Sequence, residues 1–200
     1  MRVLVHICCA PCALMTVQGL QEEGCELMGL FYNPNVHPYT ENQRRLETLT
    51  GWAGGQGLDL IVQDEYEPEK WLRRTAFREE MRCRICYHDR LTRAAQVAKR
   101  GKFDAFTTTL LYSVRQKHEM LRELGEAVAS ERGVKFLYRD FRPYWREGIK
   151  RSQELGLYRQ QYCGCIFSER DRYLGAGAKS RQPIPQPRGD QHGRTATSRD

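Results

Sequence analysis

The sequence lacks any long apolar run. Across its 200 residues, no segment approaches the about 20 consecutive apolar residues that a membrane-spanning helix requires. The opening stretch, MRVLVHICC, lacks both the length and the small-residue cleavage site of a secretory signal peptide. These absences predict a cytoplasmic protein with no membrane partner.

A glycine-rich phosphate loop is also missing. Parallel α/β enzymes that use ATP place such a loop directly after the first strand, where backbone N–H groups bind phosphate. In this chain the apolar run 2–7 instead continues into HICCAPCA, residues 6–13, which places Cys8, Cys9 and Cys12 within five positions. Thiols in place of glycines argue against ATP as a substrate.

Acidic residues are fewer than basic ones, 25 against 32, and the formal net charge is +7. A basic protein of this size often binds nucleic acid, although the same surplus can serve solubility alone. The charge therefore indicates an RNA or DNA partner without deciding for one.

Apolar runs alternate with segments of helical periodicity five times. The predicted strands are 2–7, 25–33, 58–64, 103–110 and 134–140, and the predicted helices are 13–24, 40–53, 68–76, 83–99 and 117–133. Such alternation predicts an α/β fold, a Rossmann-like parallel sheet with helices on both faces. Because ligands of these folds bind beyond the carboxyl ends of the strands, a metal site is expected at that edge.

The composition changes after Leu174. Residues 175–200 contain almost no apolar side chains and carry five basic residues against two acidic ones. We therefore expect one catalytic domain over residues 1–174, followed by a disordered basic tail over residues 175–200.

Seven of the eight cysteines fall in three clusters. In a cytoplasmic chain, clustered thiols indicate metal or redox chemistry rather than structural disulfides. Cys9-x-x-Cys12 and Cys83-x-x-Cys86 supply four soft ligands, which suit zinc or an iron–sulfur cluster. The position of the first pair at the predicted ligand edge favours a working cofactor over a structural zinc ion.

Three interpretations are open for Cys8 and for the pair Cys163 and Cys165. Neighbouring side chains of an extended chain point to opposite sides, so Cys8 is expected to face away from the centre that Cys9 faces. Cys8, Cys163 and Cys165 would then bind a second metal ion with an open position. Alternatively, Cys163 and Cys165 form a redox dithiol, or they join Cys83 and Cys86 in a four-thiolate zinc site.

The motifs HICCAPC, YNPNVHP, CRICY, FTTTLLYSVRQKHE and YCGC, in that order, resemble the cobalamin-independent epoxyqueuosine reductase family QueH. The resemblance runs from about Val3 to Arg172. It implies reduction of the epoxide of epoxyqueuosine, at the wobble position of a tRNA anticodon, to the alkene of queuosine. It further implies a [4Fe-4S] cluster, an adjacent iron ion, no cobalamin and an external electron donor.

The same resemblance assigns the site residues. It implies cluster ligation by Cys8, Cys9, Cys83 and Cys86 and a redox-active pair at Cys163 and Cys165. The spacing of the thiols instead puts Cys12 on the cluster and Cys8 on the second metal, so Cys8 and Cys12 remain open. His37, within the matched motif NPNVHP, is the predicted proton donor.

Residues 139–151, RDFRPYWREGIKR, interleave cations with aromatic side chains. Cations for phosphates and aromatics for unstacked bases are typical of RNA recognition, whereas an amphipathic helix with buried aromatics would show the same pattern. The predicted RNA contacts are Arg142, Tyr144, Trp145, Arg146 and Lys150, with Asn33 and Asn35 as further candidates. Residues 73–84 form a second basic strip.

Two other functions fit parts of this pattern. A zinc-containing RNA-binding module without catalysis would use the same thiols. A cluster-dependent tRNA-thiolating enzyme would share the α/β architecture, but the missing phosphate loop argues against it.

Overall fold

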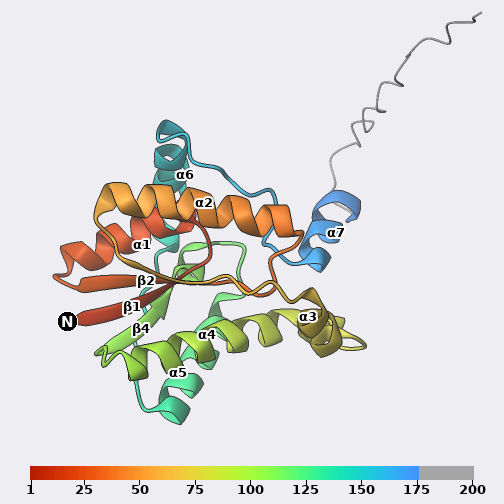
Figure 1. Cartoon of the computed structure of the whole chain (residues 1–200), viewed down its shortest axis with the longest axis horizontal. Helices are drawn as coiled ribbons and strands as arrows, with labels where there is room; N and C mark the ends of the chain where they lie inside the picture. Colours follow the sequence, from red (N-terminus) through yellow and green to blue (C-terminus); the bar gives the residue numbers. More distant parts are fainter. Residues whose placement is uncertain (176–200) are drawn as a thin grey trace, which may run out of the picture.

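The computed structural model describes residues 1–175 and contains a five-stranded sheet in the order β3-β2-β1-β4-β5, with all neighbours parallel (Figure 1). The strands are β1 Arg2–Ile7, β2 Glu26–Tyr32, β3 Leu60–Gln63, β4 Ala105–Thr108 and β5 Lys135–Phe136. The Rossmann-like α/β prediction is confirmed. The tail predicted over residues 175–200 lies, beyond Gly175, outside the described residues.

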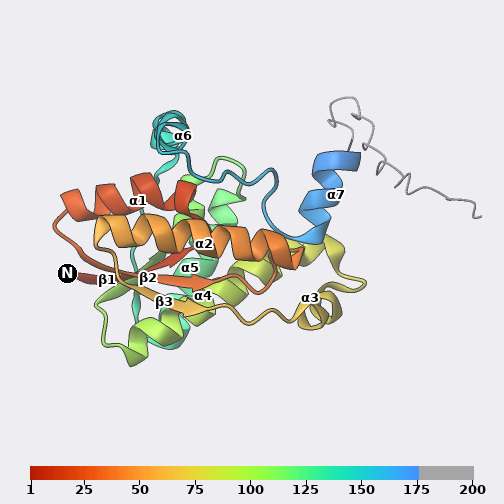
Figure 2. The same cartoon turned by 45° about the horizontal axis from the view of Figure 1, so that its top comes forward.

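Helices cover both faces of the sheet (Figure 2). On one face lie α1 Ala10–Glu22 and α2 Tyr39–Gln56, with α6 Trp145–Glu154 packed on α1. On the other lie α4 Arg82–Arg100 and α5 His118–Arg132. Two short helices, α3 Pro68–Thr75 and α7 Ile166–Leu174, extend from one end of the molecule in both views. Single 3₁₀ turns are η1 Glu79–Met81, η2 Thr109–Tyr112 and η3 Arg142–Tyr144.

The centre of the sheet is the core of the protein. β1 is inaccessible to solvent from Val3 to Ile7, because it has strands on both sides and helices on both faces. A strand buried in this way is expected to read as a continuous apolar run, as this one does. None of the helices in residues 1–175 combines the length and hydropathy needed to cross a bilayer.

The strand order reverses direction at β1. The chain runs outward through β2 and β3 on one side, and then through β4 and β5 on the other. The crevice at the carboxyl ends of β1 and β4 is therefore the switch point where α/β folds bind ligands. His6 of β1 stands opposite Thr108 of β4, and their side chains are 2.8 Å apart, so residues 8–9 and Thr109 emerge together at this edge.

Candidate metal and substrate site

Three cysteine thiols meet at the switch point. β1 ends at Ile7 and α1 begins at Ala10, with Cys9 as its N-cap residue. The sulfur atoms of Cys8, Cys9 and Cys12 all lie within 4.8 Å of one another, and those of Cys8 and Cys9 are 3.7 Å apart. The expectation that Cys8 faces away from Cys9 is wrong, because the chain leaves the strand before Cys8 and the alternation of side chains ends with it.

The surroundings of the three thiols favour one negative charge among them. The Cys8 backbone N–H donates to Thr109 Oγ1 over 3.1 Å, and that hydroxyl lies 3.4 Å from the Cys8 sulfur. Hydrogen bonds from Cys12 and Cys9 hold the pKa of Cys8 well below its usual range. The bond to Cys8 raises the pKa of Cys12, and burial raises that of Cys9 to about 12. Three buried soft donors this close suit a thiolate-binding metal.

The other two cysteine clusters approach each other. Cys83 and Cys86 lie in the first turns of α4, and Cys163 and Cys165 lie in the loop before α7. Burial raises the pKa of Cys83, and it raises that of Cys86 to about 12; the nearby Cys163 and Cys165 raise both further. The clusters CRIC and YCGC are therefore electrostatic neighbours.

Arg90 lies near two of these groups. It is buried on α4, and its guanidinium donates to Asn35 Oδ1 over 2.6 and 3.1 Å. Its positive charge contributes to lowering the pKa of Cys8 and opposes the rise at Cys86. A buried cation in this position would offset the negative charge of thiolates bound to a metal.

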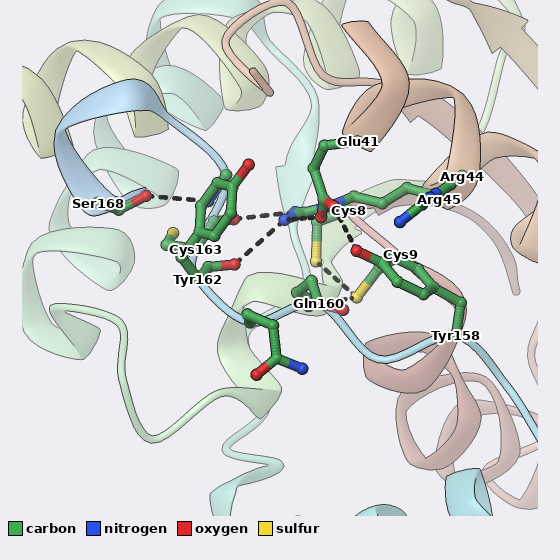
Figure 3. A network of polar contacts seen from close by, with 12 residues as sticks. Cys8, Cys9, Glu41, Arg44, Arg45, Tyr158, Gln160, Tyr162, Cys163 and Ser168 are labelled. Atoms are coloured by element: carbon green, nitrogen blue, oxygen red, sulfur yellow. Dashed lines mark hydrogen bonds and ion pairs between the residues drawn. The ribbon is translucent and has the colours of Figure 1, made fainter. Parts of the chain in front are cut away.

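A second buried arginine holds the YCGC loop (Figure 3). Arg45 on α2 is 1% exposed and donates to the Glu41 carboxylate over 2.7 Å. Its other nitrogens donate to the backbone carbonyls of Cys163 over 2.9 Å and Tyr162 over 3.1 Å. Burial acts to lower the pKa of Arg45, but Cys9 and Glu41 outweigh it and raise the pKa. The guanidinium therefore stays charged between the loop and the cysteine turn.

Further contacts close this loop over the site. The His37 backbone N–H donates to the Gly164 carbonyl over 2.8 Å, and the Tyr162 hydroxyl donates to the His37 carbonyl over 2.5 Å. Gly164 has a φ of +146°, a conformation that favours glycine. The Gln160 amide donates to the Cys9 sulfur over 3.0 Å. The loop thus reaches the first cysteine cluster directly.

A cavity of about 790 Å³ opens beside these thiols. Its walls include Cys8, Cys12 and Cys163, and the rings of Tyr112 and Trp145, which pack against each other at an interplanar angle of 41° with centroids 5.1 Å apart. Three arginines also line it: Arg115, Arg159 and Arg172. Thiols, aromatic rings and cations together suit an anionic ligand with planar groups, such as a nucleotide.

The predicted RNA residues are distributed unevenly. Trp145 lines the cavity, whereas Tyr144 and Arg146 are exposed on the surface. Arg142 is paired with Asp140 and Lys150 with Glu154. Asn33 and Asn35 are buried; Asn33 donates to the Ile7 carbonyl over 3.0 Å, and Asn35 accepts from Arg90.

His37 has its imidazole packed edge-on against Tyr66, with ring centroids 5.9 Å apart, and within residues 1–175 it is not part of the cavity wall. Burial lowers its pKa. Its backbone anchors the YCGC loop, and its role as proton donor stays a prediction.

Sequence reasoning missed both buried arginines and the two glutamines near sulfur. Gln116 donates to the Cys163 sulfur over 3.3 Å, as Gln160 does to Cys9. One signal was available for Arg45: Glu41, Arg45, Leu49 and Trp52 recur at helical spacing and form the buried face of α2. No comparable pattern marks the glutamines, because their partners lie far away in the sequence.

Comparison with known proteins identifies several relatives of this chain. A family model described as Epoxyqueuosine reductase QueH matches residues 3–171. A protein of that name from Dehalococcoides mccartyi is 36% identical over 172 residues, which are 86% of this chain and 94% of that protein. A protein of the same name from Thermotoga maritima is also 36% identical, over 85% of this chain and 91% of its own length. A third protein of this name, from Haemophilus influenzae, is 31% identical over 92% of this chain and 78% of its own length.

A solved structure shares the fold. A predicted subunit of a tRNA methyltransferase from Methanocaldococcus jannaschii superposes with a TM-score of 0.54, covering 77% of this chain and 75% of that one. At 10% sequence identity, this likeness concerns the architecture alone.

Proposed function

Because the chain belongs to the epoxyqueuosine reductase QueH family, we propose that it removes the epoxide oxygen of epoxyqueuosine in tRNA and leaves the alkene of queuosine. The reaction consumes two electrons and two protons and releases water. The observation that carries the proposal is that thiols of two cysteine clusters, Cys8, Cys12 and Cys163, line one cavity large enough for a nucleoside.

The thiols fit an iron–sulfur cofactor. Cys9, Cys83 and Cys86, completed by either Cys8 or Cys12, would hold a [4Fe-4S] cluster, for which the clustered soft donors and the cations Arg45 and Arg90 are suited. Such a cluster supplies electrons one at a time. Cys163 and Cys165 would act as a redox pair. Alternatively, if Cys12 completes the cluster, Cys8, Cys163 and Cys165 would hold a second iron ion, which would supply Lewis-acid chemistry.

The remaining cavity residues bind the nucleotide. Trp145, with the buried Tyr112 packed against it, would stack on the modified base, which must leave the anticodon stack to enter. Arg115, Arg159 and Arg172 would neutralise neighbouring phosphates. The loop held by Arg45 would exclude water from the thiols beneath it. An external donor would supply the electrons, and residues 1–174 would carry the whole activity.

The test is anaerobic incubation of the protein with tRNA that contains epoxyqueuosine and with a chemical reductant. The expected result is a nucleoside that has lost one oxygen atom, produced by a brown protein with broad absorbance at about 400 nm. An unchanged nucleoside with this cofactor present would contradict the proposal. A colourless protein with stoichiometric zinc would instead support an RNA-binding module.

A further inference from the structure

Phe77 is the most exposed large apolar residue in the described part of the chain. Its side chain is 99% exposed, on the connection between α3 and η1. Its φ is +58°, in the left-handed region that bulky residues rarely occupy. The Glu79 carboxylate accepts the Phe77 backbone N–H over 3.1 Å and so helps to fix this bend. An unfavourable backbone conformation that presents an aromatic ring to water indicates a binding role rather than a packing role.

The surroundings of Phe77 are cationic. Residues 72–84 contain five arginines against two glutamates. Arg74 pairs with Asp89 and Arg82 with Asp171, whereas Arg73, Arg78 and Arg84 are exposed and form no ion pair with any residue of the described range 1–175. An exposed ring among free guanidinium groups matches single-stranded nucleic acid, in which bases stack on the ring and phosphates pair with the cations.

The same segment adjoins the cavity. Arg82 bonds Asp171 over 2.6 Å, and Asp171 lines the cavity wall. Cys83 follows Arg82 directly. Figures 1 and 2 both show α3 and α7 extending from the same end of the molecule. RNA that delivers a nucleotide to the cavity would therefore pass near Phe77.

We propose that Phe77 stacks on an unpaired base of the anticodon loop next to the modified nucleotide, while Arg73, Arg78 and Arg84 contact the adjoining phosphates. This inference rests on the proposed function. It assigns Phe77 to RNA positioning, outside the thiol site and the cavity wall.

The test measures binding of a fluorescent anticodon stem-loop to the full chain and to Phe77→Gly, Phe77→Trp and Leu155→Ala. Glycine removes the ring and relieves the strained φ, so Phe77→Gly should fold at least as stably as the wild type yet bind about 5- to 100-fold more weakly. Phe77→Trp should retain affinity. Leu155→Ala, at another exposed apolar position that directly follows the distant helix α6, should bind as the wild type does. A stem-loop with an abasic position beside the modified nucleotide should bind wild type and Phe77→Gly equally.

Equal affinity of Phe77→Gly and wild type for the intact stem-loop would overturn the proposal. The proposal would also be overturned if Phe77→Gly changed the self-association of the protein, measured by sedimentation, without changing its affinity for RNA. The ring would then contact a second copy of the chain. If the wild type binds the stem-loop more tightly than Phe77→Gly does but leaves the nucleoside unreduced, the reductase function fails and the stacking role stands. If it reduces the nucleoside and Phe77→Gly binds normally, only the stacking role fails.

Discussion

Arg45 on α2 donates a 2.9 Å hydrogen bond to the backbone carbonyl of Cys163, 118 positions further along the chain. The same side chain is paired with Glu41 and lies beside Cys9. One buried cation thus connects the cysteine turn after β1 with the loop that carries the last two cysteines.

Replacing Arg45 should therefore cost stability. In Arg45→Gln, the Glu41 carboxylate remains buried without its cation, and two backbone carbonyls lose their donors. Loss of one partner of a buried ion pair costs about 3–5 kcal/mol, so the free energy of unfolding in urea should fall by that amount. The neighbouring Arg44→Gln, at an exposed position, should change it by less than about 0.5 kcal/mol. An Arg45→Gln effect as small as that of Arg44→Gln would show that the ion pair is not needed.

Gly164 should tolerate no side chain. A Cβ atom there would lie 3.0 Å from Val36 Cγ2 and 3.2 Å from Arg45 Nη1, and the φ of +146° disfavours any other residue. Gly164→Ala should lower the free energy of unfolding by about 1–3 kcal/mol and reduce reductase activity, because the loop must shift. Gly55→Ala, within α2 and with open space around it, should instead raise stability by about 0.5–1 kcal/mol. Unfolding curves compare the two, and a Gly164→Ala protein as stable as wild type would contradict the expected strain.

The sequence predicted the five strands and the helices α1 to α5 because their signals are local, whereas α6 and α7 were not among the predicted helices. The buried run 2–7, the alternating elements and the cysteine spacings are all visible within a few residues of each other. The meeting of the cysteine turn after β1 with Thr109 after β4 followed from topology, since parallel strands bring their carboxyl ends to one edge.

Local signals of this kind could not predict hydrogen-bond partners that lie far apart in the sequence. Arginines were interpreted as cations for RNA, yet Arg45 and Arg90 are buried, and their partners lie at Tyr162, Cys163 and Asn35. The helical spacing of Arg45 with Leu49 and Trp52 indicates the buried face of α2, but it does not show that a loop from far along the chain folds back over that face. Likewise, Asn33 and Asn35 were candidates for RNA contacts because their amides suit hydrogen bonds to a base or ribose, whereas the structure engages both amides inside the protein.

His118 should make stability depend on pH. Its imidazole is buried at the start of α5, beside Tyr138 at 2.9 Å and Asp140 at 4.0 Å. Burial, with help from Arg142 and Arg122, lowers its pKa below the ordinary 6.5, although Asp140 and Glu119 oppose this. The unfolded chain therefore takes up a proton first as the pH falls, and the free energy of unfolding should decrease below about pH 6.5.

Two variants isolate this contribution. His118→Gln keeps a hydrogen-bonding group near Tyr138 but cannot titrate, so its free energy of unfolding should vary less steeply between about pH 7 and pH 5. His88→Gln, at an exposed position on α4, should follow the wild-type slope. Parallel pH series of urea unfolding give the slopes. A His118→Gln slope equal to that of the wild type would assign the pH dependence to other groups.

Cys163 should be required for reduction but not for the first cysteine cluster. Its thiol is exposed, lines the cavity and accepts a hydrogen bond from Gln116, whereas Cys8, Cys9 and Cys12 are buried together at the switch point. Cys163→Ser should therefore retain most of the iron–sulfur absorbance while losing at least about 100-fold in turnover, since serine is neither a redox partner nor a soft ligand. Cys25 directly precedes β2, at the amino ends of the strands and away from the cavity, so Cys25→Ser should leave both the absorbance and the turnover unchanged. Anaerobic turnover and the visible spectrum, measured on the same samples, separate the outcomes. Full turnover of Cys163→Ser would exclude both the redox-pair role and the second-iron role. Loss of the visible absorbance would place Cys163 among the cluster ligands instead.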